Sequence, residues 1–467
     1  MQQFENPTNL SKPLTPPLLS TINNRNSEIS ETTTGKQDVR NEDPTELSAS
    51  ETLVLKGVTQ ILLPGHEQTL SSSQTNDENV VVIQNAKIIC IGPCTSHLTS
   101  NTNLTTLSLS QGHLTPTLTS FGSLLGLEEI AGEPATSDGS NSHSSFSAAI
   151  DGLSFDGKNL HAAFAHGVTR AITAPKFGGA DHKGIGVAFR TGAKHALEKG
   201  AVIEEAVGLH YTLSKQEGTP SLSSAVDELR GKLFKALRSG STKQQEEVSN
   251  DDANDDEQTL EARSWAKVVQ GEMPLIVGVH SADLIASLVR LKSEVDRAML
   301  KRAQSSTESR TEGQARSLRL IILGGAEAHL LAPELASANI GVILSPLFSY
   351  AATWDQRRAL TGAPLTNGTA VDALYFAGVK VAIGVDEDWE ARDLFLQAGI
   401  VRTNSMGKIN DTEALGMVSS KIWEMVGLEG HEEGSLNEFV VHEGDPLGIE
   451  SRVRVVVDGM GGVKVWS

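Results

Sequence analysis

Three short apolar runs constrain the fold of this chain more than any other feature of its sequence. They lie at residues 318–323, 340–344 and 379–385. Each is rich in β-branched side chains and mostly lacks the apolar–polar alternation of a half-exposed strand, which is typical of strands buried on both faces of a parallel sheet. Helical patterns at residues 328–338 and 369–377 separate them, so the region is expected to repeat strand–helix units with right-handed crossovers.

The middle of the chain carries eight expected strands in all. They lie at residues 114–121, 168–174, 185–190, 207–213, 275–280, 318–323, 340–344 and 379–386. Eight strand–helix units in about 300 residues predict a (β/α)8 TIM barrel over residues 116–425. A doubly wound open sheet is the alternative, which is disfavoured because no GxGxxG motif follows a strand. In either fold, function is expected at the carboxyl ends of the strands.

The two ends of the chain differ from this middle part in pattern. Residues 51–115 and 426–467 contain strand patterns separated by glycine turns, and both ends are expected to pair in one small β-sandwich. Residues 1–50 are rich in Ser, Thr, Asn and Pro with few large apolar side chains, and are expected to be disordered. An acidic stretch near residues 240–260 is expected to be a solvated loop of the barrel.

Charge and composition exclude several classes of partner. The net charge is −19, from 58 acidic and 39 basic residues, and no basic stripe is present. This disfavours binding to nucleic acid and to anionic membranes. The N-terminus lacks a signal-peptide pattern and no run of ~18 apolar residues exists, so we expect an intracellular, cytoplasmic protein. The two cysteines, Cys90 and Cys94, form no disulfide framework and are interpreted as ordinary strand or loop residues.

Several segments recur in an order that is typical of one family and together cover most of residues 53–460. They are VIQNAKIICIG (82–92), LTPTLTSFGSLLGLEEI (114–130), AFAHGVTRAITAPKFGG (163–179), VGVHSADLIASLVRLKSEV (277–295), GGAEAHLLAPELASANIGVILSP (324–346), AGVKVAIGVDEDW (377–389) and GSLNEFVVHEGDPLG (434–448). In this order they resemble the amidohydrolase superfamily, in its imidazolonepropionase-like branch. Fungal proteins of this type are often grouped with the carbohydrate esterase family 9 deacetylases. The resemblance implies a metal-dependent (β/α)8 barrel with a β-sandwich built from both chain ends.

The resemblance is weaker at the positions that bind metal in this family. Members usually carry His-x-His after the first strand, and this chain has Gly122-Ser123-Leu124 there. Deacetylase members can work with one metal and without that pair. A one-metal site would need a carboxylate near strand three or four, for which Glu204 and Glu205 are candidates. The alternative for these two residues is a solvated pair at a helix end.

A one-metal site would also need a histidine after strand five and another after strand six. His280 ends strand five and is the best candidate ligand, although related bacterial sequences carry histidine at the position of Gly278. His329 lies five residues beyond Gly324, the family position after strand six. Its helical surroundings make a packing role the alternative.

Asp386 follows the eighth strand and matches the family aspartate that binds metal and acts as general base. A carboxylate in that place can accept the proton of an attacking water. The alternative is a cap for the following helix, for which Asp388 is equally suitable. Arg357 and Arg358 follow strand seven and are candidates for binding substrate, with structural ion pairs as the alternative.

The sequence leaves two hypotheses for the function. The resemblance implies a hydrolase of a non-peptide C–N bond in an amide, a cyclic amide or an N-acetyl group. A divalent metal, expected to be zinc, would be held by His280, His329 and Asp386. The alternative is a degenerate barrel, a pseudoenzyme that has lost its metal and binds a ligand or partner, because a fold does not guarantee its usual chemistry. A small molecule is the expected partner in both cases, and a homo-oligomer is left open.

Overall fold

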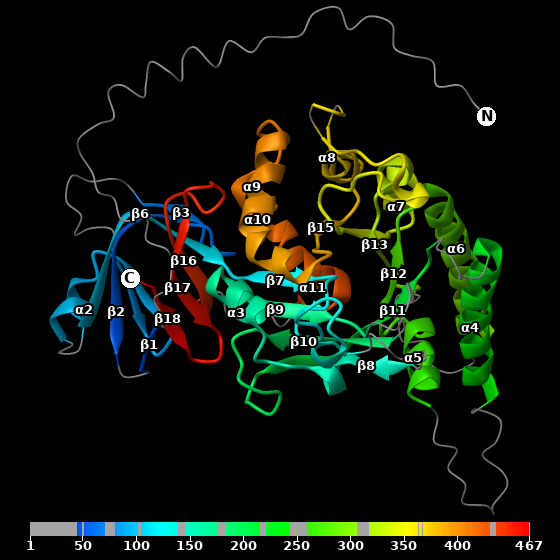
Figure 1. Ribbon diagram of the computed structural model, residues 1–467, viewed down its shortest axis with the longest axis horizontal. Helices are drawn as coiled ribbons and strands as arrows, with labels where there is room; N and C mark the ends of the chain where they lie inside the picture. The colour runs from blue at the N-terminus through cyan, green and yellow to red at the C-terminus, as the bar shows by residue number, and fades with distance from the viewer. Residues whose placement is uncertain are drawn as a thin grey trace, which may run out of the picture. The chain divides into compact units, whose positions relative to one another are not determined.

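Two β-sheets dominate this computed structural model, and helices surround the second sheet (Figure 1). The structure describes residues 44–48, 51–70, 80–100, 104–138, 146–175, 184–214, 221–242, 259–305, 317–362, 364–366, 368–429 and 436–466. These residues all belong to one unit of the chain, Pro44–Ser467. No helix among them is both long and apolar enough to cross a membrane.

The first sheet, sheet A, combines strands from both ends of the chain. Its described strands are β1 (Thr45–Leu47), β2 (Thr52–Ile61), β3 (Gln68–Thr69), β4 (Val80–Gln84), β5 (Lys87–Gly92), β6 (Leu104–Pro116), β16 (Glu438–Glu443), β17 (Arg452–Asp458) and β18 (Val463–Val465). They follow the order β1-β18-β17-β16-β6-β2-β4-β5, with β3 paired to β2. The two chain ends meet where β6 pairs antiparallel with β16. The expected pairing of the ends is therefore present, and its arrangement as a sandwich stays a prediction.

Sheet A differs from the sequence analysis in two places. Thr45–Leu47 form an edge strand paired with β18, so this part of the predicted disordered segment 1–50 is ordered. Residues 1–43, 49 and 50 of that segment lie outside the described residues. Cys90 and Cys94 form a disulfide, so their interpretation as ordinary residues is wrong. Left-handed backbone at Cys94, φ 46°, folds the chain back after β5 and brings the two Cα atoms to 5.9 Å. Disulfides are uncommon in the cytosol, and the cytoplasmic location stays a prediction.

The second sheet, sheet B, contains seven of the eight strands expected in the middle of the chain, and the expected strand at 114–121 is divided between β6 of sheet A and the first strand of sheet B. Its main strands are β7 (Leu118–Phe121), β9 (Val168–Thr173), β10 (Gly184–Arg190), β11 (Val202–Thr212), β12 (Leu275–Val279), β13 (Leu320–Gly324), β14 (Gly341–Leu344) and β15 (Val381–Ile383), and β8 (Ser147–Ala148) pairs with β10. They are hydrogen-bonded in this order from β7 to β15. The N–H of Val385 donates to the carbonyl of Phe121 at 2.9 Å, so the last strand reaches the first and the barrel is nearly closed.

The packing inside sheet B confirms that the strands surround a common centre. Each of the eight main strands contributes one buried side chain to a single apolar cluster: Phe121, Ile172, Ala188, Val207, Ile276, Ile321, Ile343 and Ala382. Helix α11 (Ser420–Val426) adds Ile422, Trp423 and Met425 to this cluster. Met425 lies against Gly341 at the start of β14, so α11 covers the amino end of the barrel. Site residues are therefore expected at the opposite end.

One strand departs from the predicted all-parallel barrel. β10 runs antiparallel to both β9 and β11, whereas the pairs from β11 to β15 are parallel. Ten residues connect β9 to β10 and eleven connect β10 to β11. Such connections are shorter than the dozen or more residues that a parallel crossover needs. The barrel is therefore TIM-like with one reversed strand.

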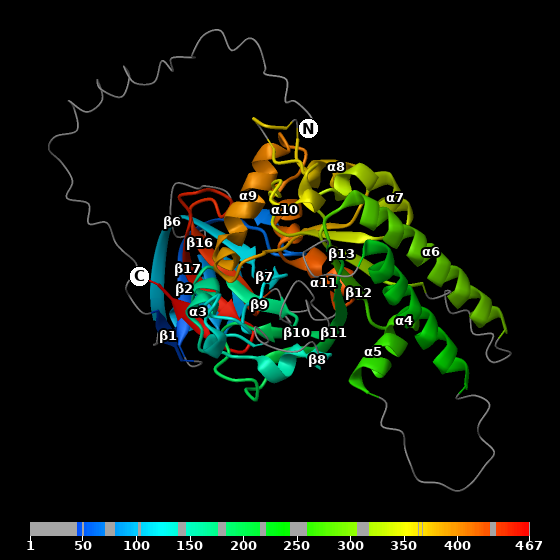
Figure 2. The same cartoon turned by 45° about the vertical axis from the view of Figure 1, so that its right-hand side comes forward.

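Helices cover the outside of sheet B. The described α-helices are α2 (Thr95–Ser100), which follows β5, and α3 (Lys158–Ala165), α4 (Leu222–Thr242), α5 (Leu260–Val269), α6 (Ala282–Ser305), α7 (Ala332–Ser337), α8 (Ala370–Phe376), α9 (Leu394–Asn404), α10 (Asp411–Met417) and α11. Short 3-10 helices are η1 (Pro134–Thr136), η2 (Ala149–Gly152), η3 (Ala328–Leu331), η4 (Trp354–Gln356) and η5 (Asp388–Asp393). Figure 2 shows α4 beside α6, where Arg230 bonds to Glu294. Most of the acidic stretch near 240–260 lies outside the described residues.

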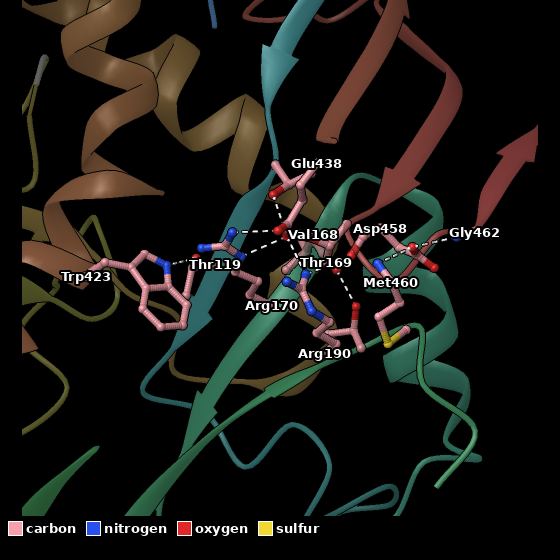
Figure 3. A network of polar contacts seen from close by, with 12 residues as sticks. Thr119, Val168, Thr169, Arg170, Arg190, Trp423, Glu438, Asp458, Met460 and Gly462 are labelled. Carbon is pink, nitrogen blue, oxygen red and sulfur yellow. Dashed lines mark hydrogen bonds and ion pairs between the residues drawn. The ribbon is translucent and has the colours of Figure 1, made fainter. Parts of the chain in front are cut away.

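A buried ionic network joins the two sheets (Figure 3). The carboxylate of Glu438, at the start of β16, accepts hydrogen bonds from Arg170 Nε at 2.7 Å and Nη2 at 2.5 Å, and from Thr169 Oγ1 at 2.7 Å. Arg190 Nη1 lies 2.8 Å from the same carboxylate and donates to the carbonyl of Asp458 at 2.7 Å. Burial opposes ionisation, but the bonds and charge of Arg170 outweigh it, so the pKa of Glu438 is lowered. Barrel and sheet A are thus held together through charge.

Candidate functional site

The carboxyl ends of the parallel strands of sheet B meet at one end of the barrel, opposite α11. We call this end the mouth, defined by the described residues that follow β7, β11, β12, β13, β14 and β15 up to the next α-helix. In TIM-like barrels this end carries the functional groups, while the other end serves stability. The predicted residues His280, His329, Asp386, Arg357 and Arg358 all lie at the mouth.

His280 follows β12 directly, and its ring fills the space beside a glycine of the next strand. A Cβ atom placed on Gly324 would lie 2.7 Å from His280 Cε1, so no larger residue fits there while His280 keeps this position. Its Nδ1 atom is buried and has no hydrogen-bond partner among the described residues. Burial lowers the pKa of His280, opposed by the charge of Asp355, so the ring is neutral near pH 7.

His329 lies in η3, one segment further round the mouth. Its side chain is partly buried, and its Nδ1 atom also has no hydrogen-bond partner among the described residues. Burial lowers the pKa of His329, while a bond with the backbone of Ala326 and the charge of Glu327 oppose the shift. His329 is therefore a second neutral imidazole at the mouth.

Neither aspartate after β15 is the cap of the helix that follows, which was the alternative to a site role. Asp386 is exposed, and its N–H donates to Glu390 at 3.0 Å. Glu387 is the N-cap of η5 and forms a capping box with Glu390, so neither aspartate caps this helix. The carboxyl group of Asp388 instead hydrogen-bonds to Ser123. Ser123 belongs to Gly122-Ser123-Leu124, the segment that stands where the family has His-x-His.

Asp388 is the site residue that sequence reasoning missed. Ser123 and the N–H of Leu124 hydrogen-bond to its carboxyl group, while the Oδ1 atom is buried without a partner among the described residues. Burial raises its pKa to about 7, and the charges of Glu128 and Glu387 add to the rise. The local sequence GVDEDW offers no signal that separates Asp388 from Asp386, because the contact is with a segment more than 200 residues earlier.

Ion pairs within the protein hold Arg358. Its Nη2 atom lies 2.6 Å from Glu327 Oε2 and 3.4 Å from Asp283. The fully buried Glu327 also accepts the N–H of Ala282 at 3.0 Å and that of Arg358 at 2.9 Å. Burial opposes ionisation of Glu327, but these bonds outweigh it and lower its pKa. Glu327 thereby connects the segments after β12, β13 and β14, a role that its place in a helical pattern did not indicate.

Arg357 packs against its own segment of the chain. Its guanidinium group stacks on the ring of Trp354 with 4.8 Å to the ring centroid, and its Nη1 atom donates to the Trp354 carbonyl at 2.9 Å. Its Nη2 atom lies 3.8 Å from Asp283. The alternative of structural ion pairs thus describes the contacts of both arginines, and their binding of substrate stays a prediction.

The donor groups at the mouth do not fit a metal centre. Among the described residues, no three His, Cys, Asp or Glu side chains lie together as metal ligands would, so His280, His329 and Asp386 do not form such a group. Gly122 has φ 110°, and a Cβ there would lie 2.7 Å from the carbonyl of Val385, so a ligand side chain at this position would clash. Glu204 lies in the first half of β11, toward the end opposite the mouth.

Comparisons with known proteins agree with this architecture. A scan against protein-family models finds no match. The chain is 39 % identical over 416 residues to Amidohydrolase tasK of Hapsidospora irregularis, and the match covers 86 % of this chain and 42 % of that protein. The chain therefore spans less than half the length of this curated relative. It is also similar to an amidohydrolase structure from Thermotoga maritima MSB8, with a TM-score of 0.65, 19 % identity, and coverage of 89 % of this chain and 99 % of that one.

These findings define the fold of the chain. The barrel with its composite sheet has the amidohydrolase fold, as the Thermotoga maritima structure shows. The relative from Hapsidospora irregularis supports the amidohydrolase superfamily for this chain. The imidazolonepropionase-like branch and carbohydrate esterase family 9 stay predictions.

Proposed function

We propose that this chain binds a small polar organic molecule at the mouth, and that it lacks the metal centre of the hydrolases it resembles. The observation that carries the proposal is a set of buried polar atoms without hydrogen-bond partners among the described residues. Those on segments that follow β7, β11, β12, β13 and β15 are Ser137 Oγ, Ser214 Oγ, His280 Nδ1, His329 Nδ1 and Asp388 Oδ1. Each such atom costs about 1–3 kcal/mol. Their concentration at one end of the barrel supports a ligand that supplies the missing bonds.

The chemistry of these atoms favours an uncharged ligand. Burial keeps the imidazoles of His280 and His329 neutral, and the two hydroxyl groups carry no charge. The carboxyl group of Asp388, with a pKa raised to about 7, is protonated in about half of the molecules near neutral pH. Arg357 and Arg358 face Asp283 and Glu327, so their charges are compensated within the protein. Neutral donors and acceptors suit amide or hydroxyl groups, which exchange hydrogen bonds with both kinds of atom.

The missing metal centre is tested by metal content. The purified full chain is incubated with zinc, desalted and measured by elemental mass spectrometry, beside His280→Ala and a control, His161→Ala on the exposed face of α3. We expect zinc far below one ion per chain, with no difference among the three proteins. About one zinc per chain, lost in His280→Ala and kept in His161→Ala, would overturn this part of the proposal.

Ligand binding is tested with acetamide, the smallest neutral amide. Saturation-transfer NMR should detect its binding to the wild-type chain at millimolar concentration. His280→Ala removes one of the unpaired nitrogens and should weaken the signal severalfold, and His161→Ala should leave it unchanged. No transfer to acetamide, or equal transfer in all three proteins, would contradict a polar ligand site at the mouth.

Hydrolysis of a non-peptide C–N bond is the second candidate, favoured by the name of the relative at 39 % identity. Its substrate would be an amide, a cyclic amide or an N-acetyl group, and the expected metal would be zinc. The described residues do not bring together the ligands that such a metal needs. Turnover of cyclic amides or N-acetyl sugars that chelators abolish and zinc restores would replace the first proposal with this one.

A further inference from the structure

Two tryptophans at the mouth are exposed to an unusual degree. The chain has five tryptophans, of which Trp354 is 69 % and Trp389 is 50 % exposed. Trp265, Trp423 and Trp466 are buried, at 9 % or less. Large aromatic rings at the surface are enriched in binding sites, because one ring offers a broad apolar face at low entropic cost. Both residues belong to segments at the end of the barrel where the unpaired polar atoms are found.

Each exposed tryptophan is the direct neighbour of an acid that faces the mouth. Trp354 precedes Asp355, which is buried and whose charge acts on His280 after β12. Trp389 follows Asp388, which bonds to Ser123 after β7. The two tryptophans therefore belong to neighbouring segments of the mouth, Trp354 to the segment after β14 and Trp389 to the segment after β15.

The ring of Trp354 is held in place rather than left to rotate. Arg357 covers one face of the indole at 4.8 Å and bonds to the Trp354 carbonyl, and Arg357 in turn lies 3.8 Å from Asp283. The residue nevertheless remains 69 % exposed. A fixed, exposed aromatic ring loses little freedom when a ligand stacks on it, so it is preorganised for binding.

The charges near the mouth restrict the class of ligand that can bind there. Asp283, Glu387 and Glu128 lie near the mouth residues, while Arg357 and Arg358 face carboxylates of the protein. These acids disfavour an anion placed next to them. The neutral imidazoles and hydroxyls described above suit uncharged polar groups.

We propose that the ligand of the mouth is an uncharged molecule that carries a planar ring together with amide or hydroxyl groups, and that Trp354 and Trp389 contact its ring. This inference rests on the proposed function, because the polar part of the ligand would bond to the unpaired atoms of the mouth. The two tryptophans would make the site prefer ligands that carry a planar ring over ligands that lack one.

The test compares three probes that differ in one property each. Benzamide carries a ring and a neutral amide, acetamide lacks the ring, and benzoate carries the ring with a negative charge. Binding to the full chain is followed by saturation-transfer NMR and by the protection of tryptophan fluorescence from iodide quenching. The variants are Trp354→Ala and Trp389→Ala, with Phe376→Ala on the exposed face of α8 as control. Circular dichroism verifies that each variant is folded.

We expect benzamide to bind more tightly than acetamide and benzoate. Each tryptophan substitution should weaken benzamide about twofold to tenfold, the range of one aromatic contact, and should leave acetamide unchanged. Phe376→Ala should have no effect. Benzamide binding that is lost in His280→Ala yet unchanged in both tryptophan variants would overturn the inference and leave the proposed function intact. Absence of binding by both benzamide and acetamide would overturn both, and preference for benzoate would overturn the uncharged ligand.

Discussion

Replacing Glu438 with glutamine should destabilise the protein more than any other single charge removal in sheet A. The substitution keeps the shape of the side chain and removes the charge that compensates Arg170 and Arg190. Arg170 and Glu438 are only 8 % and 6 % exposed, so Arg170 would remain as a buried cation. Breaking one partner of a buried ion pair costs about 3–5 kcal/mol.

The expected change in melting temperature follows from the size of the folded unit. Unfolding entropy is about 2.1 cal/mol/K per residue, so a unit of roughly 400 residues loses about 1 °C per kcal/mol. Glu438→Gln should therefore unfold about 3–6 °C below the wild type at pH 7. Urea titration followed by circular dichroism measures the same loss as a free energy.

A matched control lies at the other end of the same strand. Glu443 ends β16 and pairs with Arg454 at 2.6 Å, with side chains that are 27 % and 19 % exposed. Glu443→Gln should cost about 1 kcal/mol or less, because a partly solvated pair is weak. Since the pKa of Glu438 is lowered in the folded state, its stabilisation is present above pH 4.5 and is lost in more acidic solution. Equal losses for both variants at pH 7 would refute the reasoning.

Three further predictions concern the mouth. Asp388→Asn should raise the free energy of unfolding by up to about 4 kcal/mol above pH 7 and should not change it below pH 4. The reason is that a pKa raised from 3.8 to about 7 destabilises the folded state only where the free carboxyl group would be ionised. Melting curves of variant and wild type from pH 4 to 9 measure this, and a difference in melting temperature that does not depend on pH would contradict it. Arg358→Met should cost about 2 kcal/mol by leaving the buried Glu327 with backbone donors alone, measured by urea titration, and no loss would show that those donors suffice. Gly122→Ala should lower the melting temperature because its Cβ would lie 2.7 Å from the Val385 carbonyl; an unchanged melting temperature would refute this close approach.

Sequence patterns located the strands because burial on both faces leaves a continuous apolar run. The runs at 275–280, 318–323 and 340–344 coincide with β12, β13 and β14 to within about two residues. The reversal of β10 was not predicted, because an apolar run carries no direction. Only the short connections on either side of it contain that information.

The candidate site was harder to predict than the fold. His280 was found because it ends a recognisable strand. Asp388 was missed because its significance depends on Ser123, which lies far away in the sequence and close in space. The disulfide of Cys90 and Cys94 was not predicted, because it accompanies a left-handed backbone conformation at Cys94 that cysteine does not favour.

The position of β16 in sheet A has a consequence for how the protein is made. β16 pairs with β6, yet more than 300 residues separate them along the chain. While the ribosome is still synthesising the barrel, β6 presents an open strand edge, and Arg170 and Arg190 lack their carboxylate partner. Open edges attract other chains. A nascent chain should therefore depend on chaperones until its last strands emerge, and premature stop codons before residue 438 should give insoluble products rather than a smaller folded protein.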